Sequence, residues 1–266
     1  MLEIKNITKI FNAGTVNEKV ALDDVSLTLN DGDFVTVIGG NGAGKSTLLN
    51  IVAGTYMVDE GKILINDTDV TKLPEYKRAK YIGRVFQDPM VGTAADMWIE
   101  ENMALAMRRG KSRGFSWAIN KSDRKLFKEL LSQLDLGLEN RLSTKVALLS
   151  GGQRQAITLL MASMTKPELL LLDEHTAALD PKTASKVLEI TNNIVESNSL
   201  TTLMITHNMH DAITHGNRLI MMNAGKIILD ISGEEKKQLT VEQLLQKFEE
   251  VSGSKLENDR MLLADK

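Results

Sequence analysis

The sequence predicts an α/β protein in which a mixed, largely parallel sheet is joined by an N-terminal antiparallel β layer and a helical insertion. Three patterns predict this class. A strand at 34–38 runs directly into a glycine-rich loop and a helical segment. Short apolar strands at 169–172, 201–205 and 219–222 alternate with helical segments, the order that builds a parallel sheet covered on both faces. Helical periodicity dominates residues 88–165, which we interpret as the insertion.

The remaining elements follow from local patterns. Residues 2–7 begin a strand, and a second strand at 20–29 ends at a polar turn, so the two predict the antiparallel layer. Residues 62–65 and 81–86 are further strands. At the end of the chain, an apolar stripe at 241–251 has helical spacing and begins with a Thr/Gln capping box, which predicts a docking helix.

Composition excludes several classes of protein. The 266 residues are 42% hydrophobic and 25% charged, as in an ordinary globular protein. A net charge of -3 argues against a nucleic-acid binder. No apolar run approaches the roughly 18 residues of a membrane-spanning helix, and residues 1–11 lack the features of a secretory signal. The absence of cysteine is compatible with the cytoplasm.

The loop after the 34–38 strand predicts a phosphate-binding site. It fits G-x-x-x-x-G-K-[ST] with Gly39, Gly40, Asn41, Gly42, Ala43, Gly44, Lys45 and Ser46. Glycines let the backbone turn its N–H groups onto phosphate oxygens, and the following helix adds the positive end of its dipole. We expect Lys45 to bridge the β and γ phosphates of a bound nucleotide and Ser46 to bind Mg²⁺. Thr47 is expected to cap the helix and bond the α phosphate.

Two acidic residues end the apolar strand at 169–172. Burying charge is costly unless it meets a cation or water, so we expect Asp173 to bind Mg²⁺. Glu174 would then face the γ phosphate and orient or deprotonate the attacking water.

A second glycine-rich helix start has no lysine. It consists of Ser150, Gly151, Gly152 and Gln153, which follow Leu149 and precede an apolar helical face. A serine and two glycines before a helix form an arrangement that binds an anion.

The order of these motifs resembles the nucleotide-binding subunit of an ATP-binding cassette (ABC) transporter, whose signature LSGGQ stands here at 149–153. The resemblance covers about residues 2–232 and implies the ABC ATPase form of the P-loop NTPase core. It implies an ATPase domain at 1–232 with a helical subdomain at about 88–165. A C-terminal helical tail follows at 233–266.

The resemblance also implies residue roles. Gln87 matches a glutamine that touches Mg²⁺ and senses the membrane partner, and His207 matches a histidine that contacts the γ phosphate. Phe11 matches an aromatic residue that stacks on adenine. Asp180 matches the D-loop, and locally it also caps a helix. The implied catalytic residues are Glu174, His207 and Gln87, and the implied magnesium ligands are Ser46, Gln87 and Asp173. His175 departs from the family's usual Pro or Ala, and the sequence gives no mechanism for it.

In this family each signature closes on the nucleotide held by the opposite chain, which implies a homodimer or paired ATPase around two ATP molecules. The expected partners are two separate permease subunits and a solute-binding protein, without nucleic acid. The chain would lie peripherally at the cytoplasmic face of the cell membrane. A stand-alone cassette fits an importer best, and the runs at 87–90 and 173–178 resemble a subgroup for amino-acid uptake, including aromatic amino acids. The alternatives are an exporter or a non-transport regulatory ATPase.

Three other interpretations remain to be compared with the structure. Asn120 to Asp123 spells the N-K-x-D of GTPases, but the D-x-x-G that should precede it occurs only at 230–233, so a helix cap is the better interpretation. His207, His210 and His215 could form a zinc cluster. A basic cluster faces either lipid headgroups or a permease, or is a solvated loop. It comprises Arg108, Arg109, Lys111 and Arg113, near Phe115 and Trp117.

Overall fold

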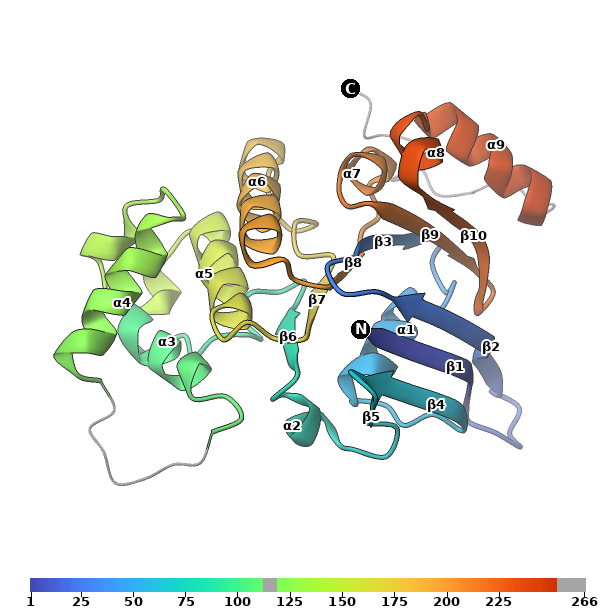
Figure 1. The fold of residues 1–266 in the computed structure, drawn as a ribbon, viewed down its shortest axis with the longest axis horizontal. Coiled ribbons are helices and arrows are strands. Elements are labelled where there is room, and N and C mark those ends of the chain that lie inside the picture. Colours follow the sequence, from blue (N-terminus) through green and yellow to red (C-terminus); the bar gives the residue numbers. More distant parts are fainter. Residues whose placement is uncertain (112–118, 253–266) are drawn as a thin grey trace.

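The computed structural model describes residues 1–111 and 119–252 as an α/β structure with two sheets and a helical region to one side (Figure 1). The larger sheet has the strand order β10-β9-β3-β8-β7-β6. Its strands are β3 (Phe34–Gly39), β6 (Ile82–Val85), β7 (Leu169–Asp173), β8 (Thr202–Ile205), β9 (Arg218–Asn223) and β10 (Lys226–Ser232). All neighbours pair in parallel except β9 and β10, so the sheet is mixed and mostly parallel, as predicted.

The smaller sheet is the expected antiparallel layer, with the order β2-β1-β4-β5. Its strands are β1 (Leu2–Phe11), β2 (Lys19–Leu29), β4 (Glu60–Ile65) and β5 (Thr68–Asp69). Helix α1 (Lys45–Ala53) packs between the two sheets in one apolar core. This core takes Val35 and Val37 from β3, Leu169 and Leu171 from β7, and apolar side chains from β1 and β2. The sandwiched position fixes α1 relative to the strand that precedes it.

Residues on the opposite face of the larger sheet pack against helices. Leu170 and Leu172 of β7 join a core with α5 (Gly151–Ser163) and α6 (Pro181–Asn198). The same core extends into the helical region formed by α3 (Ile99–Met107), α4 (Lys121–Ser132) and the short 3₁₀ segments η1 (Leu138–Asn140) and η2 (Val146–Leu148). Asn120 caps α4 by accepting a hydrogen bond from the N–H of Asp123, which confirms the cap interpretation of this segment.

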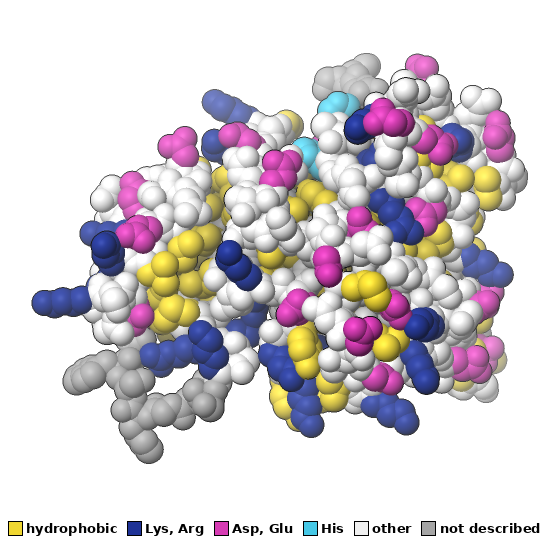
Figure 2. All heavy atoms as spheres, viewed as in Figure 1, with side chains coloured by type: hydrophobic (Ala, Val, Ile, Leu, Met, Phe, Trp, Pro, Cys, Tyr) yellow, Lys and Arg dark blue, Asp and Glu magenta, His cyan; other side chains and the backbone are white. Residues whose placement is uncertain are grey.

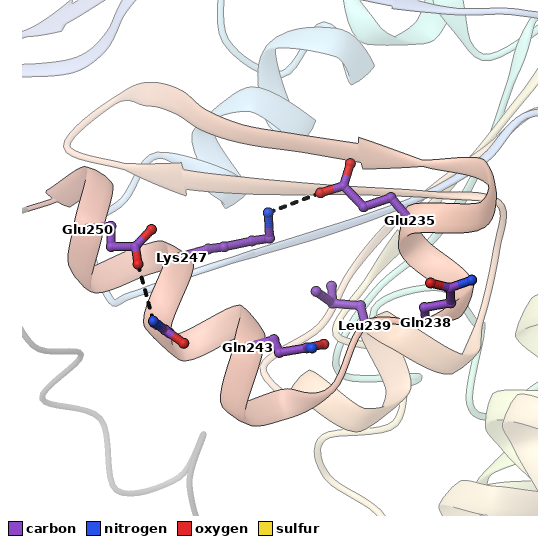
Figure 3. Close-up of a pocket in the computed structure, with 7 residues that line it drawn as sticks. Glu235, Gln238, Leu239, Gln243, Lys247 and Glu250 are labelled. Atoms are coloured by element: carbon purple, nitrogen blue, oxygen red, sulfur yellow. Dashed lines mark hydrogen bonds and ion pairs between the residues drawn. The ribbon is translucent and has the colours of Figure 1, made fainter.

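The C-terminal helices α8 (Gly233–Lys237) and α9 (Val241–Ser252) lie against the β9–β10 edge beside α7 (Met209–Thr214). Leu244 and Phe248 of α9 are buried there. The Thr240 and Gln243 capping box forms, with hydrogen bonds of 3.0 and 3.2 Å. A shallow pocket of about 350 Å³ lies between α8 and α9, where Lys247 pairs with Glu235 (Figure 3).

The strand predictions hold, with shifts at the ends, and two strands were not predicted. The missed strands are β10, the second arm of a hairpin, and the two-residue β5. A further short helix, α2 (Glu75–Arg78), precedes β6. Among the described residues, no helix combines the length and the apolarity needed to cross a membrane.

Candidate nucleotide-binding site

Four of the predicted motifs follow parallel strands of the larger sheet, whose carboxyl ends meet at one edge. The phosphate-binding loop follows β3, and Asp173 and Glu174 stand at the end of β7. His207 comes two residues after β8, and Gln87 comes two residues after β6. The strand order therefore brings together motifs that are far apart in the chain.

A cavity of about 240 Å³ opens at this edge. It is lined by Phe11, Lys19, Ala21, Asn41, Gly42, Ala43, Gly44, Lys45, Ser46, Thr47, Glu174 and His207. Eight of the predicted nucleotide-binding residues and two of the predicted catalytic residues thus surround one space. Gln87 and Asp173 do not line this cavity, and neither does the signature segment 150–153.

Two glycines of the loop have no substitute. Gly39 has a φ of 150°, and a Cβ there would lie 2.2 Å from the carbonyl oxygen of Met222. Gly44 has a φ of 103°, and a Cβ there would lie 2.7 Å from the carbonyl oxygen of Ala21. The loop is therefore pressed against β9 and β2, and only glycine fits these two positions.

The helix that follows the loop starts without a capping side chain. Its N-cap is Gly44, in the left-handed region, and its first turn contains no acidic residue. The first N–H groups of a helix have no partner within the helix, and they carry the positive end of its dipole. This helix start is suited to an anion. Thr47 lies within the first turn, so the prediction that it caps the helix is wrong.

The Lys45 side chain is folded back onto its own loop. Its ammonium donates hydrogen bonds to the carbonyl oxygens of Gly39 at 2.7 Å and Gly40 at 3.0 Å. Burial lowers the pKa of Lys45, while the nearby charges of Glu174 and Asp173 oppose this shift. The buried ammonium of Lys45 therefore supplies positive charge to a site that also carries two carboxylates.

Glu174 and His207 form a pair. Nε2 of His207 and Oε1 of Glu174 lie 2.5 Å apart, and both side chains are largely buried. Glu174 has a φ of 48°, a left-handed backbone that is uncommon for a non-glycine residue and costs about 1 kcal/mol. The fold holds this carboxylate at the cavity in spite of that strain.

Asp173 lies beside Arg84 of β6, with Oδ2 3.5 Å from the Nη2 atom. Burial raises the pKa of Asp173, and the charge of Arg84 opposes the rise. The sequence analysis did not identify Arg84. Gln87 lies three residues further on, exposed, past the end of β6.

Phe11, at the end of β1, meets Tyr56 in an edge-to-face contact with ring centroids 5.3 Å apart. Its register partner in β2 is Lys19, which also lines the cavity. Neither Lys19 nor Tyr56 was predicted. The ring of Phe11 can stack on a heterocycle, and the neighbouring Lys19 can attract the phosphates linked to it.

The signature segment and the D-loop lie side by side. Ser150 caps α5 in a capping box with Gln153, with hydrogen bonds of 3.3 and 3.2 Å. A Cβ on Gly151 would lie 3.3 Å from Leu179, and one on Gly152 would lie 2.2 Å from the Thr183 side chain. Asp180 caps α6 by accepting from the N–H of Thr183, as expected.

His175, the residue after Glu174, is buried. Its Nε2 lies 2.9 Å from the Thr191 hydroxyl, which itself donates to the carbonyl of Val187. The hydroxyl proton is thus used, so the imidazole donates to Thr191. Burial lowers the pKa of His175 to about 4, so this side chain is neutral at physiological pH. The contact ties the 174–180 segment to α6.

The zinc interpretation is not supported. Within residues 1–111 and 119–252, no three His, Cys, Asp or Glu side chains are grouped to hold a metal. His207 pairs with Glu174, and Nδ1 of His215 is bonded to Asn192.

One member of the basic cluster, Arg109, has a structural role. Arg109 donates to the carbonyl of Ala162 and the hydroxyl of Thr165, both at 2.8 Å, so it holds α3 against the end of α5. Arg113, Phe115 and Trp117 lie outside the described residues.

The parallel sheet, the glycine loop and the lysine and carboxylate around one cavity define a P-loop ATPase. The family model of the ABC transporter matches residues 22–177, more than half of the chain. The chain belongs to this family and is an ABC-type ATPase, the ATP-binding subunit of a transporter.

Relatives with known names share most of the chain. It is 45% identical to the tyrosine transport ATP-binding protein of Clostridioides difficile over 94% of this chain and 99% of the relative. It is 30% identical to the phosphonates import ATP-binding protein PhnC of Lactococcus lactis, over 93% and 99%. It is 34% identical to the spermidine/putrescine import ATP-binding protein PotA of Haemophilus ducreyi, over 86% of this chain but only 57% of that longer protein.

Solved cassettes share the fold. A dimeric ATP-binding cassette in a post-hydrolysis state, bound to ADP and Pi, matches with a TM-score of 0.74 at 30% identity, over 87% of this chain and 98% of that one. The ADP conformation of another cassette of an ABC transporter matches with a TM-score of 0.77 at 27% identity, over 96% and 99%.

Proposed function

We propose that the chain hydrolyses ATP with Mg²⁺ between two protomers and thereby drives import through separate permease subunits. The observation that carries this proposal is that the motifs lie in two separate places on one chain. Lys45, Glu174 and His207 line one cavity with the phosphate loop, whereas the signature segment 150–153 and Asp180 lie together away from it. A second protomer would bring the latter pair onto the nucleotide, and the solved dimeric cassettes support this arrangement.

Magnesium fits the available donors. The Ser46 hydroxyl is exposed at the start of α1, and Asp173 and Gln87 add a carboxylate and an amide oxygen, the hard ligands that Mg²⁺ prefers. The raised pKa of Asp173 shows a carboxylate short of solvation, which a cation would stabilise. When bound, the ion would neutralise charge on the β and γ phosphates.

The protein's own groups then act on the attacking water. Glu174 accepts its proton. His207, whose Nε2 lies 2.5 Å from the same carboxylate, orients that group and would contact the γ phosphate. Lys45 exchanges its carbonyl acceptors for phosphate oxygens, which bind an ammonium more strongly because they are charged. Phe11 supports the adenine ring.

A groove between the end of the sheet and the helical region supports permease docking. This groove of about 390 Å³ is lined by Arg84, Gly92, Ala94, Asn102, Leu105, Ala106, Arg109, Thr158, Met161 and Ala162. Figure 2 shows hydrophobic side chains gathered on the helical region, over α3 and α5. Leu105 of α3 and Trp98, the residue before α3, are 49% and 43% exposed, so both present large apolar side chains to solvent. Docking there would place the chain at the cytoplasmic face of the membrane.

The proposed substrate is an amino acid of the aromatic type, because the relative that matches nearly end to end at 45% identity is a tyrosine transport protein. We also propose that residues 1–232 form the ATPase domain, with the helical subdomain at about 88–165, and that 233–266 form a tail that docks through α9.

The test is Glu174→Gln, which keeps the size of the side chain and removes the base. We expect ATP hydrolysis to fall about 100-fold or more, with ATP binding retained and an ATP-bound dimer accumulating on gel filtration. Glu189→Gln, on the exposed face of α6, is the matched control and should hydrolyse ATP normally. Normal hydrolysis by Glu174→Gln would refute the assignment of the base.

A further inference from the structure

Arg84 is a nearly buried cation at the edge of the site that the proposed mechanism does not use. Its backbone in β6 lies opposite Leu171 in β7, so its side chain points to the same face as Asp173, two residues beyond Leu171. Nη2 lies 3.5 Å from Oδ2 of Asp173, and the two side chains are only 12% and 17% exposed. Because water solvates both groups poorly, the charge of each is stabilised mainly by the opposite charge of the other.

The guanidinium also contacts the other two elements that carry proposed magnesium ligands. Nη2 donates to Oδ1 of Asn50 at 2.7 Å, and Asn50 lies one helical turn after Ser46 on α1. The guanidinium carbon lies 4.5 Å from the ring centre of Phe86, the residue before Gln87. One side chain thus contacts α1, β7 and the segment after β6.

The remaining contacts of Arg84 are weaker or missing. Nη1 donates to the Thr55 hydroxyl at 3.1 Å, and the pair with the half-exposed Glu75 is long, at 3.9 Å. Nε is buried, and it has no hydrogen-bond partner among the described residues. A buried N–H without a partner costs about 1–3 kcal/mol, so an apolar side chain would serve packing better. The arrangement is better explained by the pair with Asp173.

We propose that Arg84 is a positioning residue for the magnesium site: it fixes the carboxylate of Asp173 relative to α1 and to the segment that carries Gln87. Groups that orient a metal ligand from behind typically change metal affinity by about 10–100-fold when they are removed. The inference rests on the proposed magnesium dependence of the chain.

The test measures binding rather than hydrolysis. A fluorescent N-methylanthraniloyl ATP is titrated in EDTA, and Mg²⁺ is then added at fixed nucleotide concentration. For Arg84→Gln we expect nucleotide affinity in EDTA to stay within about twofold of wild type, since Arg84 does not line the nucleotide cavity. The half-saturating Mg²⁺ concentration should rise about tenfold or more.

Two further variants complete the experiment. Glu75→Gln removes the long, exposed pair of the same arginine and should leave the magnesium curve unchanged. Arg84→Lys keeps the charge but loses the planar fork, so it should give an intermediate shift, and it decides the matter if Arg84→Gln does not fold.

An unchanged or lower magnesium requirement in the folded Arg84 variants would overturn the inference while leaving the proposed function intact. If wild-type binding shows no response to Mg²⁺, the proposed magnesium dependence fails, and the role of Arg84 fails with it.

Discussion

Two helix starts in this chain are rich in glycine, and they differ in how their N–H groups are satisfied. At α1 the N-cap is a left-handed glycine and no side chain caps the turn. At α5 Ser150 and Gln153 cap each other, although both hydrogen bonds are long. The first start faces a cavity with a lysine, whereas the second packs against Leu179 and Thr183 of its own chain. We infer that the start of α1 binds phosphate within a single protomer. The start of α5 binds phosphate only when the nucleotide is held by another protomer.

The sharpest test of this difference is Lys45→Ala. Two hydrogen bonds from the ammonium to charged phosphate oxygens would be lost, so we expect the ATP affinity of the single subunit to fall about 100-fold, or about 3 kcal/mol. Isothermal titration calorimetry measures it. Lys186→Ala, on the exposed surface of α6, is the control. Unchanged affinity in Lys45→Ala would remove this lysine from the phosphate site.

Residues 174–180 connect the nucleotide cavity, at Glu174, with the signature region, at Asp180. This segment contains a buried titratable residue, His175. His175 has a pKa of about 4 in the folded state, against 6.5 when it is exposed. Between these values the unfolded chain binds the proton first, so stability is complete above pH 6.5 and declines as the pH falls toward 4. From this residue we expect the free energy of unfolding to be about 2 kcal/mol lower at pH 5 than at pH 7.5.

The measurement is urea denaturation at the two pH values. His175→Gln can still donate to Thr191 but does not titrate, so the loss between the two pH values should shrink by about that amount. His210→Gln, at an exposed position, should leave the loss as in wild type. An undiminished loss in His175→Gln would show that other groups cause the acid sensitivity.

The second helix start is tested by Ser150→Ala. The single subunit should bind ATP as wild type does, while the ATP-driven dimer should be about tenfold weaker, because one hydroxyl donor to phosphate is lost. Analytical ultracentrifugation of the Glu174→Gln background with ATP gives the dimer constant.

Removing a helix cap also costs stability, about 1 kcal/mol. Asn120→Ala removes an equivalent cap at α4, far from the signature, and serves as the matched control. It should lose similar stability and dimerise normally. Equal weakening of both variants would mean that the dimer responds to stability alone and not to the hydroxyl of Ser150.

Local sequence patterns were sufficient to predict most features of the two glycine-rich helix starts and of the residues around them. The glycine loop, the carboxylates at the end of β7, the glycine-rich start of α5 and the cap at Asp180 each depend on a few consecutive residues, so short patterns indicated them. Thr47 failed as a cap because glycine can also occupy the N-cap position, here Gly44.

Contacts between distant segments were not predictable in the same way. Arg84 reaches Asn50 across 34 residues, and His175 reaches Thr191 through the packing of α6. Lys19 enters the cavity only because its strand pairs with the end of β1. A single sequence without an alignment does not encode such pairings in any short pattern. The hairpin strand β10, by contrast, followed the turn at Ala224 and Gly225, both with positive φ, and the glycine was a usable signal.

The smallest expected effect concerns Phe11, at the end of the nucleotide cavity that we expect to hold the adenine base. Phe11 offers a ring face, and its edge-to-face contact with Tyr56 holds that ring in place. Since an aromatic pair contributes about 1 kcal/mol, Phe11→Leu should weaken ATP binding about fivefold, and Phe11→Tyr, which keeps the ring, should stay within about twofold. Inorganic tripolyphosphate, which lacks the base, should bind both variants as it binds wild type. If Phe11→Leu weakened tripolyphosphate equally, the ring would act by shaping the phosphate loop, and the separation of base and phosphate contacts within this region would be wrong.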